Sequence, residues 1–176
     1  MKSHLCAISI AILLMSAQAA LAFNGERQGF VLGFGGGGGV TRFSGPGGCE
    51  SESAIGTTVK IGYATSDQTM VYWMSRVAWL PDALDSDLTV SHGTGGLGVT
   101  YYTRPTAPSP FIVGSIGFGN MDLPFEDVPA ETSFGIAAGG GFELTRHVAL
   151  EGVLTWTKIL EDLNLVSILF VVDLTA

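Results

Sequence analysis

The chain has 176 residues and a formal net charge of −8 at pH 7, and 14% of its residues are charged. An average soluble domain has about 25% charged residues, so an ordinary cytosolic surface is excluded. The hydrophobic fraction of 47% and the mean hydropathy of +0.41 exclude a chain that is disordered through low hydropathy. Nucleic acid is excluded as a partner, because phosphate binding needs a basic stripe and the chain has no Lys or Arg cluster.

The N-terminal segment has the pattern of a secretory signal peptide. Lys2 precedes an apolar run over residues 5–15, and small residues up to Ala22 suit a cleavage site. The run is shorter than the about 20 residues that a membrane-spanning helix needs, which disfavours an uncleaved anchor. We predict a signal peptide over residues 1–22 and one domain over residues 23–176. Cleavage removes Cys6 and leaves Cys49 alone; we interpret this thiol as inert, with an intermolecular bridge or a metal ligand as the alternative.

The remaining sequence contains eight blocks rich in Val, Ile, Thr, Gly and aromatic residues, separated by turn-forming residues. No block is an uninterrupted apolar run long enough for a membrane-spanning helix. A glycine run over residues 35–39 weakens the first block as a strand, and we interpret it as a means of letting a small barrel curve. We predict strands over residues 29–43, 55–65, 69–80, 88–103, 111–123, 132–145, 148–160 and 163–175.

Apolar residues alternate with small or polar residues in most blocks, as on a strand with two different faces. In the seventh block, Leu150 and Leu154 share one face and Glu151 lies on the other; in the third, Trp73 opposes Arg76. The polar face is too poor in charge for a water-exposed exterior, but it suits the filled lumen of an eight-stranded barrel. The apolar face then meets lipid, where a sheet has to close because an open edge leaves backbone groups unpaired. We predict an all-β fold, an eight-stranded antiparallel up-and-down transmembrane β-barrel with both termini on one side.

The stretch from Gly139 to Glu151 contains a glycine-rich strand, a tight turn at Arg146 and His147, and a second strand. Through this stretch, and over the whole of residues 23–176, the chain resembles the small eight-stranded outer-membrane β-barrel family of Gram-negative bacteria, which includes the transmembrane domain of outer membrane protein A and opacity-type, porin-like proteins. The resemblance implies a cell-envelope location in the bacterial outer membrane, insertion by the barrel assembly machinery, and contact with outer-membrane lipid and lipopolysaccharide. Members of the family usually end on an aromatic residue. This chain ends on Ala176, and Phe170, together with the apolar residues that follow it, is the candidate substitute.

Four charged residues fall on the inward face by alternation, and Asp173 is a further candidate. This lumen charge cluster consists of Lys60, Arg76, Glu143 and Glu151. Strand n faces strand n+4 across an eight-stranded barrel, so we expect Arg76 to pair with Glu151 and Lys60 with Glu143; an unpaired buried charge would cost several kcal/mol. A hairpin centred on His147 should set the two glutamates opposite each other, with a turn longer than two residues. A catalytic carboxylate pair is the alternative, which a packed lumen disfavours because it gives a substrate no access.

Aromatic residues gather toward the strand ends, where amphipathic rings suit the headgroup zones of a membrane. Trp73 and Trp79 differ by roughly 15 Å in depth, less than an apolar band of about 25 Å, so at most one of them lies in a girdle. The candidates for the aromatic girdle are Tyr63, Trp73, Trp79, Tyr101, Phe142 and Trp156.

Most of the acidic residues lie in alternate connections, which face the outside if the N-terminus is periplasmic. We interpret these connections as solvated loops; recognition of a basic partner, or divalent-cation bridging to lipopolysaccharide phosphates, is the alternative. The acids concerned are Glu50, Glu52, Asp82, Asp85, Asp87, Glu126, Asp127, Glu131, Glu161 and Asp162.

The sequence contains no arrangement typical of a catalytic or metal site. Ser91 and His92 are adjacent on one strand and face opposite ways, so they cannot act as a nucleophile and its base. We find neither the His and Cys spacing of a zinc site nor an EF-hand, and no cofactor is implied. We predict a non-catalytic outer-membrane barrel, monomeric and without an open pore, with a structural or surface-interaction role. The alternatives are a secreted soluble barrel that binds a small apolar ligand and an outer-membrane lipid-modifying enzyme.

Overall fold

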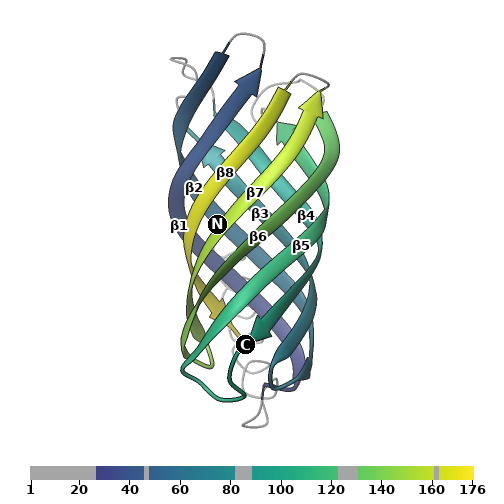
Figure 1. Cartoon of the computed structure of the whole chain (residues 1–176), viewed down its shortest axis with the longest axis vertical. Helices are drawn as coiled ribbons and strands as arrows, with labels where there is room; N and C mark the ends of the chain where they lie inside the picture. The colour runs from purple at the N-terminus through teal and green to yellow at the C-terminus, as the bar shows by residue number, and fades with distance from the viewer. Residues whose placement is uncertain (1–26, 46–47, 82–88, 123–130, 161–162) are drawn as a thin grey trace, which may run out of the picture.

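The computed structural model describes residues 27–45, 48–81, 89–122, 131–160 and 163–176, which form one closed antiparallel β-barrel (Figure 1). Each strand pairs with the next along the chain, and the last pairs with the first. The predicted fold class is confirmed. None of the described segments is a helix long and apolar enough to cross a membrane. The predicted signal peptide lies outside the described residues. The strands are β1 Gly29–Gly45, β2 Gly48–Ser66, β3 Thr69–Leu80, β4 Val90–Tyr102, β5 Ser109–Asp122, β6 Glu131–Thr145, β7 Val148–Leu160 and β8 Leu163–Thr175.

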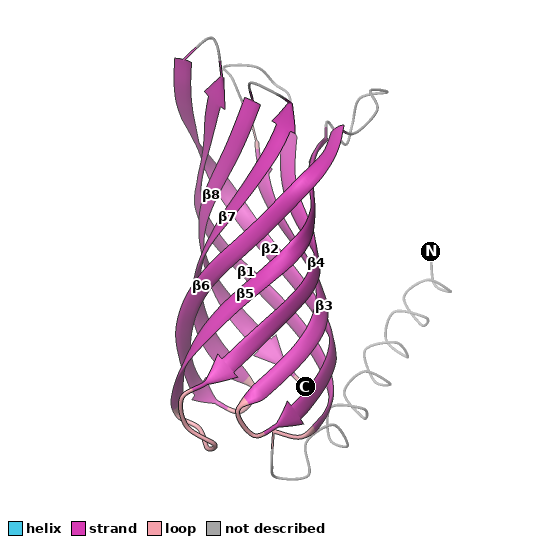
Figure 2. Cartoon of the chain, turned by 45° about the vertical axis from the view of Figure 1, so that its right-hand side comes forward, coloured by secondary structure: helices cyan, strands magenta, loops and turns pink. Residues whose placement is uncertain are grey.

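The barrel has one end with short turns and one with the remaining connections (Figure 2). The turn end holds the β2–β3, β4–β5 and β6–β7 connections, together with Arg27 and the C-terminus. There the backbone N–H of Ala176 donates to the carbonyl of Leu32 at 2.8 Å, and the N–H of Leu32 donates back at 2.9 Å, so the last residue completes the β1–β8 seam. The loop end holds the other four connections, most of whose residues lie outside the described ranges.

The faces of the sheet are inverted relative to a water-soluble barrel. Trp73, Leu150 and Leu154 point outward and are 51%, 48% and 45% exposed, whereas Arg76 and Glu151 on the same strands are 1% and 2% exposed. A soluble barrel that binds an apolar ligand would need the opposite arrangement, so that alternative is wrong. The inward-facing apolar residues form two clusters, one toward each end, and the polar groups described below lie among them.

The first connection is much shorter than predicted. We expected residues 44–54 to form a link, but β1 and β2 continue as a paired hairpin in which Phe43 lies opposite Glu50 and Ser44 opposite Cys49. Gly48, at the start of β2, has a φ of 122°, which favours glycine. The segment is polar on both faces where it leaves the rest of the sheet, so its composition resembles that of a loop although its backbone remains paired.

The β6–β7 hairpin has a two-residue turn, and the longer turn we predicted is wrong. Thr145 lies opposite Val148, but Glu143 lies opposite Ala149, so the register shifts by one residue at Leu144. This bulge returns Glu143 to the lumen face without lengthening the turn. Glu151 lies opposite Gly141, so the two glutamates are not directly opposed as we expected.

The glycine run of β1 provides a test of barrel closure. A β-carbon on Gly37 would overlap the backbone carbonyl of Phe170 on β8, whereas a β-carbon on Gly36 would meet no atom within 4 Å. We expect Gly37→Ala to lower the free energy of unfolding by at least the roughly 1–3 kcal/mol typical of overpacking. Gly36→Ala, with the same change in chain entropy, should be close to neutral. Urea unfolding of the protein refolded in lipid vesicles measures both, and equal midpoints for the two variants would contradict this account of the seam.

Candidate functional site

The centre of the lumen holds a cluster of four ionised groups. The Lys60 Nζ lies 2.7 Å from Oε2 of Glu151 and 2.7 Å from Oδ2 of Asp173. Arg76 forms an ion pair with the other oxygen of Glu151, and its Nε donates to the hydroxyl of Thr58 at 3.2 Å. The four residues come from β2, β3, β7 and β8, and all are at most 7% exposed. We call Lys60, Arg76, Glu151 and Asp173 the central cluster.

The central cluster is balanced in charge, with two cations and two carboxylates. Burying an ion costs several kcal/mol unless partners compensate, so each group here depends on the others. Oδ1 of Asp173 and Nη1 of Arg76 have no hydrogen-bond partner among the described residues. A cavity of about 10 Å³ lies beside Lys60, Tyr72 and Asp173, which is room for about one water molecule and for no organic substrate.

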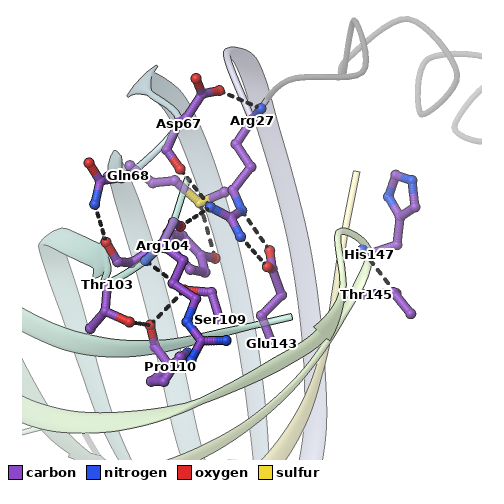
Figure 3. A network of polar contacts seen from close by, with 12 residues as sticks. Arg27, Asp67, Gln68, Thr103, Arg104, Ser109, Pro110, Glu143, Thr145 and His147 are labelled. Carbon is purple, nitrogen blue, oxygen red and sulfur yellow. Dashed lines mark hydrogen bonds and ion pairs between the residues drawn. The ribbon is translucent and has the colours of Figure 1, made fainter. Parts of the chain in front are cut away.

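A second polar group closes the turn end of the lumen (Figure 3). The guanidinium of Arg27 forms a two-point ion pair with Glu143, in which Nε donates to Oε1 at 2.9 Å and Nη2 donates to Oε2. Its Nη1 donates to the backbone carbonyls of Asp67 at 2.6 Å and Arg104 at 2.7 Å. The same guanidinium lies 4.3 Å from the centre of the Tyr102 ring, a distance suited to a cation–π contact.

These contacts make Arg27 a clasp at the mouth of the barrel. One side chain joins the segment before β1 to the β2–β3 turn, the β4–β5 connection and β6. Arg27 is 1% exposed and Glu143 is 2% exposed, so this ion pair is as inaccessible to solvent as the central cluster. We call Arg27 and Glu143 the terminal clasp.

A third, uncharged polar group lies toward the loop end. Nδ1 of His92 is 2.7 Å from the hydroxyl of Ser167, and Nε2 is 3.0 Å from the hydroxyl of Thr157. The Ser167 hydroxyl in turn lies 2.7 Å from that of Thr41. All four residues are at most 1% exposed. The hydroxyls satisfy both ring nitrogens, which is what a buried histidine requires.

The Ser167–His92 contact lacks what a nucleophilic serine needs. The third member of a catalytic triad is a carboxylate that orients the imidazole, but here that position holds the hydroxyl of Thr157. The group is also sealed from substrate on both sides by packed lumen residues. Among the described residues, no cluster of three His, Cys, Asp or Glu is arranged to hold a metal ion. The lumen therefore consists of paired polar groups, with a few single atoms left unpartnered, between apolar clusters, an arrangement suited to filling a barrel.

The sequence-based pairing scheme was partly wrong. Arg76 does contact Glu151, but Lys60 contacts Glu151 and Asp173 and does not pair with Glu143. Pairing of strand n with strand n+4 ignores the stagger between neighbouring strands of a closed barrel, which changes which residues lie at the same height. Glu143 lies nearer the turn end, where its partner is Arg27. Arg27 was missed because it precedes the predicted first strand; its only signal was the alternation it shares with the inward residues of β1.

Of the residues predicted to form the aromatic girdle, Tyr63, Tyr101 and Phe142 are exposed near the turn end. Trp73 is exposed at an intermediate height, whereas Trp79 and Trp156 are half-buried and nearer the loop end. The indole N–H of Trp79 donates to Thr57 at 2.9 Å.

The acidic residues expected in loops fall into two groups. Glu50 and Glu52 belong to β2, and Glu131 begins β6. The other acids lie outside the described residues: Asp82, Asp85, Asp87, Glu126, Asp127, Glu161 and Asp162. Cys49 is exposed at the loop end, with its Sγ 3.5 Å from the hydroxyl of Ser44.

Comparison with known proteins supports the fold from structure alone. No family model matches the sequence, and no curated protein is similar to it in sequence. The structure is similar to that of Ail, the attachment invasion locus protein of Yersinia pestis, with a TM-score of 0.59 and 13% identity over 84% of this chain and 99% of that chain. It is also similar to Neisserial surface protein A, with a TM-score of 0.54 and 15% identity over 82% of this chain and 96% of that chain.

A third similar structure is the N-terminal β-barrel domain of Pseudomonas aeruginosa OprF, with a TM-score of 0.51 and 15% identity over 83% of this chain and 97% of that chain. All three are small eight-stranded outer-membrane barrels, and the fold of this chain is theirs. At this level of identity, the likeness shows the fold and no more.

A double-mutant cycle tests the central cluster. Arg76→Met leaves two carboxylates facing the single cation Lys60, and we expect it to lower the free energy of unfolding by about 3–5 kcal/mol. Adding Glu151→Met leaves the balanced pair of Lys60 and Asp173, so the double variant should be no less stable than Arg76→Met alone. Urea unfolding in vesicles of Arg76→Met, Glu151→Met and the double variant measures the coupling energy. If the losses of the two single variants simply add up in the double variant, Arg76 and Glu151 do not stabilise each other.

The terminal clasp can be tested against a matched neighbour. Arg27→Gln leaves the buried Glu143 carboxylate without its cation, so we expect the free energy of unfolding to fall by about 3–5 kcal/mol. Arg104→Gln is the control, because its side chain is exposed and the backbone carbonyl that Arg27 uses remains. If the two variants unfold at the same urea concentration, Arg27 does not act as a clasp.

Proposed function

We propose that this chain is a non-catalytic, monomeric protein of the bacterial outer membrane, with a sealed lumen and a structural or surface-interaction role. The observation that carries the proposal is the inverted barrel, with large apolar side chains on the outside of all eight strands and ionised side chains enclosed at its centre. An apolar surface of this extent is unstable in water and stable in hydrocarbon.

The dimensions of the strands agree with this placement. A tilted strand crosses a bilayer in about 9–11 residues, and the shortest strand, Thr69–Leu80, has 12. An even number of antiparallel strands puts both ends of the barrel chain on one side. We place the turn end in the periplasm and the loop end outside the cell, with delivery by the predicted signal peptide and insertion by the barrel assembly machinery.

The lumen contents support a sealed barrel rather than a pore or an enzyme. The terminal clasp occupies one end, the central cluster the middle, and an apolar cluster that includes Leu80 and Leu165 the loop-end half. Each charged group is held by partners whose loss is costly, so the plug is a stable part of the fold. Function then resides in the surfaces, namely the lipid-facing band and the loop end.

Gel mobility of a washed membrane fraction tests the proposal. Closed barrels keep their fold in detergent until heated, so the unboiled protein should migrate differently from the boiled protein and should remain in the membrane pellet. Recovery from the soluble periplasm without a heat-dependent shift would contradict the membrane location.

Purified protein in a planar bilayer should give no steady conductance, and a stable open channel would contradict the sealed lumen.

A further inference from the structure

The outward face of β7, β8 and β1 changes from apolar to polar close to the loop end. Leu154, Ile168 and Val40 form one row across these strands, with exposed fractions of 45%, 47% and 48%. In the next row Arg42 lies level with Trp156 across β8, and in the row after it Lys158 lies opposite a polar residue of β8. The row of Arg42 still contains the apolar residues Val166 and Trp156, and the row of Lys158 is polar, so the apolar band ends on this face between its two cations.

Arg42 and Lys158 differ from the cations of the lumen because they are exposed and form no ion pair within the described part of the chain. The exposed thiol of Cys49 lies beside Arg42. The acids nearest along β2 are Glu50 and Glu52, and in register they lie opposite residues of β1 that face the lumen. By strand alternation their carboxylates therefore belong to the inner face and not to the face that carries Arg42.

The spacing of the two cations suits one anionic headgroup. A single strand, β8, separates the strands that carry them, so they are about 10 Å apart across the sheet. Both side chains are long and flexible, and Asn164 lies between their strands, opposite Lys158, where its amide can donate hydrogen bonds. Trp156 neighbours Lys158 on the same face, at the depth where indole rings favour the headgroup region.

We infer that Arg42, Lys158 and Asn164, the rim site, bind the phosphate groups of a lipid headgroup in the outer leaflet, of the kind that lipopolysaccharide carries. The inference rests on the membrane location and orientation proposed above. Cation-to-phosphate hydrogen bonds are charge-assisted and strong, and they lie where the acyl chains of the same lipid can cover the apolar row below. The rim site would thus fix one lipid molecule against β7, β8 and β1.

Native mass spectrometry of the folded protein in neutral detergent micelles tests this inference, with lipid A as the probe and EDTA present to prevent bridging by divalent cations. We expect the wild type to bind lipid A and the double variant Arg42→Gln with Lys158→Gln to bind it about 30-fold more weakly, as two cations near an anionic lipid surface predict. The double variant Arg104→Gln with Arg146→Gln, which removes two cations at the turn end, should bind like the wild type. Lipid A without its phosphates should bind as weakly as the rim variant binds intact lipid A.

Unchanged lipid A binding by the rim variant, or equal binding of phosphorylated and dephosphorylated lipid A by the wild type, would overturn the inference. The heat-dependent gel shift of the same samples separates this failure from failure of the proposed function. If the rim variant keeps its gel shift and binds lipid A like the wild type, only the rim site is refuted. If the wild type shows no gel shift, the proposed membrane barrel itself is refuted.

Discussion

Ionised side chains cannot face hydrocarbon, so at the depth of the acyl chains a closed sheet can place them only in the lumen, where each charge needs a partner. The rest of this structure depends on that constraint. Removing one partner of a buried ion pair costs about 3–5 kcal/mol, against a total stability of about 5–15 kcal/mol for a typical domain. The chain meets the constraint with two ion-pair groups, the central cluster and the terminal clasp, which join five of the eight strands and the segment before β1.

The fold could be predicted from the sequence because strand alternation is a local signal that repeats along the chain. Arg76 and Glu151 could be assigned to the lumen because their strands contrast large apolar residues with small or polar ones. Height within the barrel is a global property, set by the stagger of all the strands, and no single strand encodes it. Lys60 was therefore given the wrong carboxylate, and the bulge at Leu144, which decides the facing of Glu143, was missed.

The fifth and eighth predicted strands, residues 111–123 and 163–175, are apolar on both faces, so alternation could not assign the faces of their apolar residues. β5 carries Phe111, which is 5% exposed in the lumen, and Phe118, which is 63% exposed outside. Ser167 lies on β8, a strand of the same kind, so its contact with His92 could not be foreseen from either residue. The lumen thus serves as a filled core, and the features that can meet other molecules are on the outer face and at the loop end. This division fits a surface or structural protein better than a catalyst.

The outward placement of the indole rings allows the inverted arrangement to be measured in the unmodified protein. All three Trp residues, Trp73, Trp79 and Trp156, lie on outward-facing positions of β3 and β7. In vesicles made with lipids brominated on the acyl chains, their fluorescence should be strongly quenched, whereas aqueous iodide should quench it weakly. Ready quenching by iodide with no effect of brominated lipid would show that the apolar face does not meet acyl chains, and the account would fail.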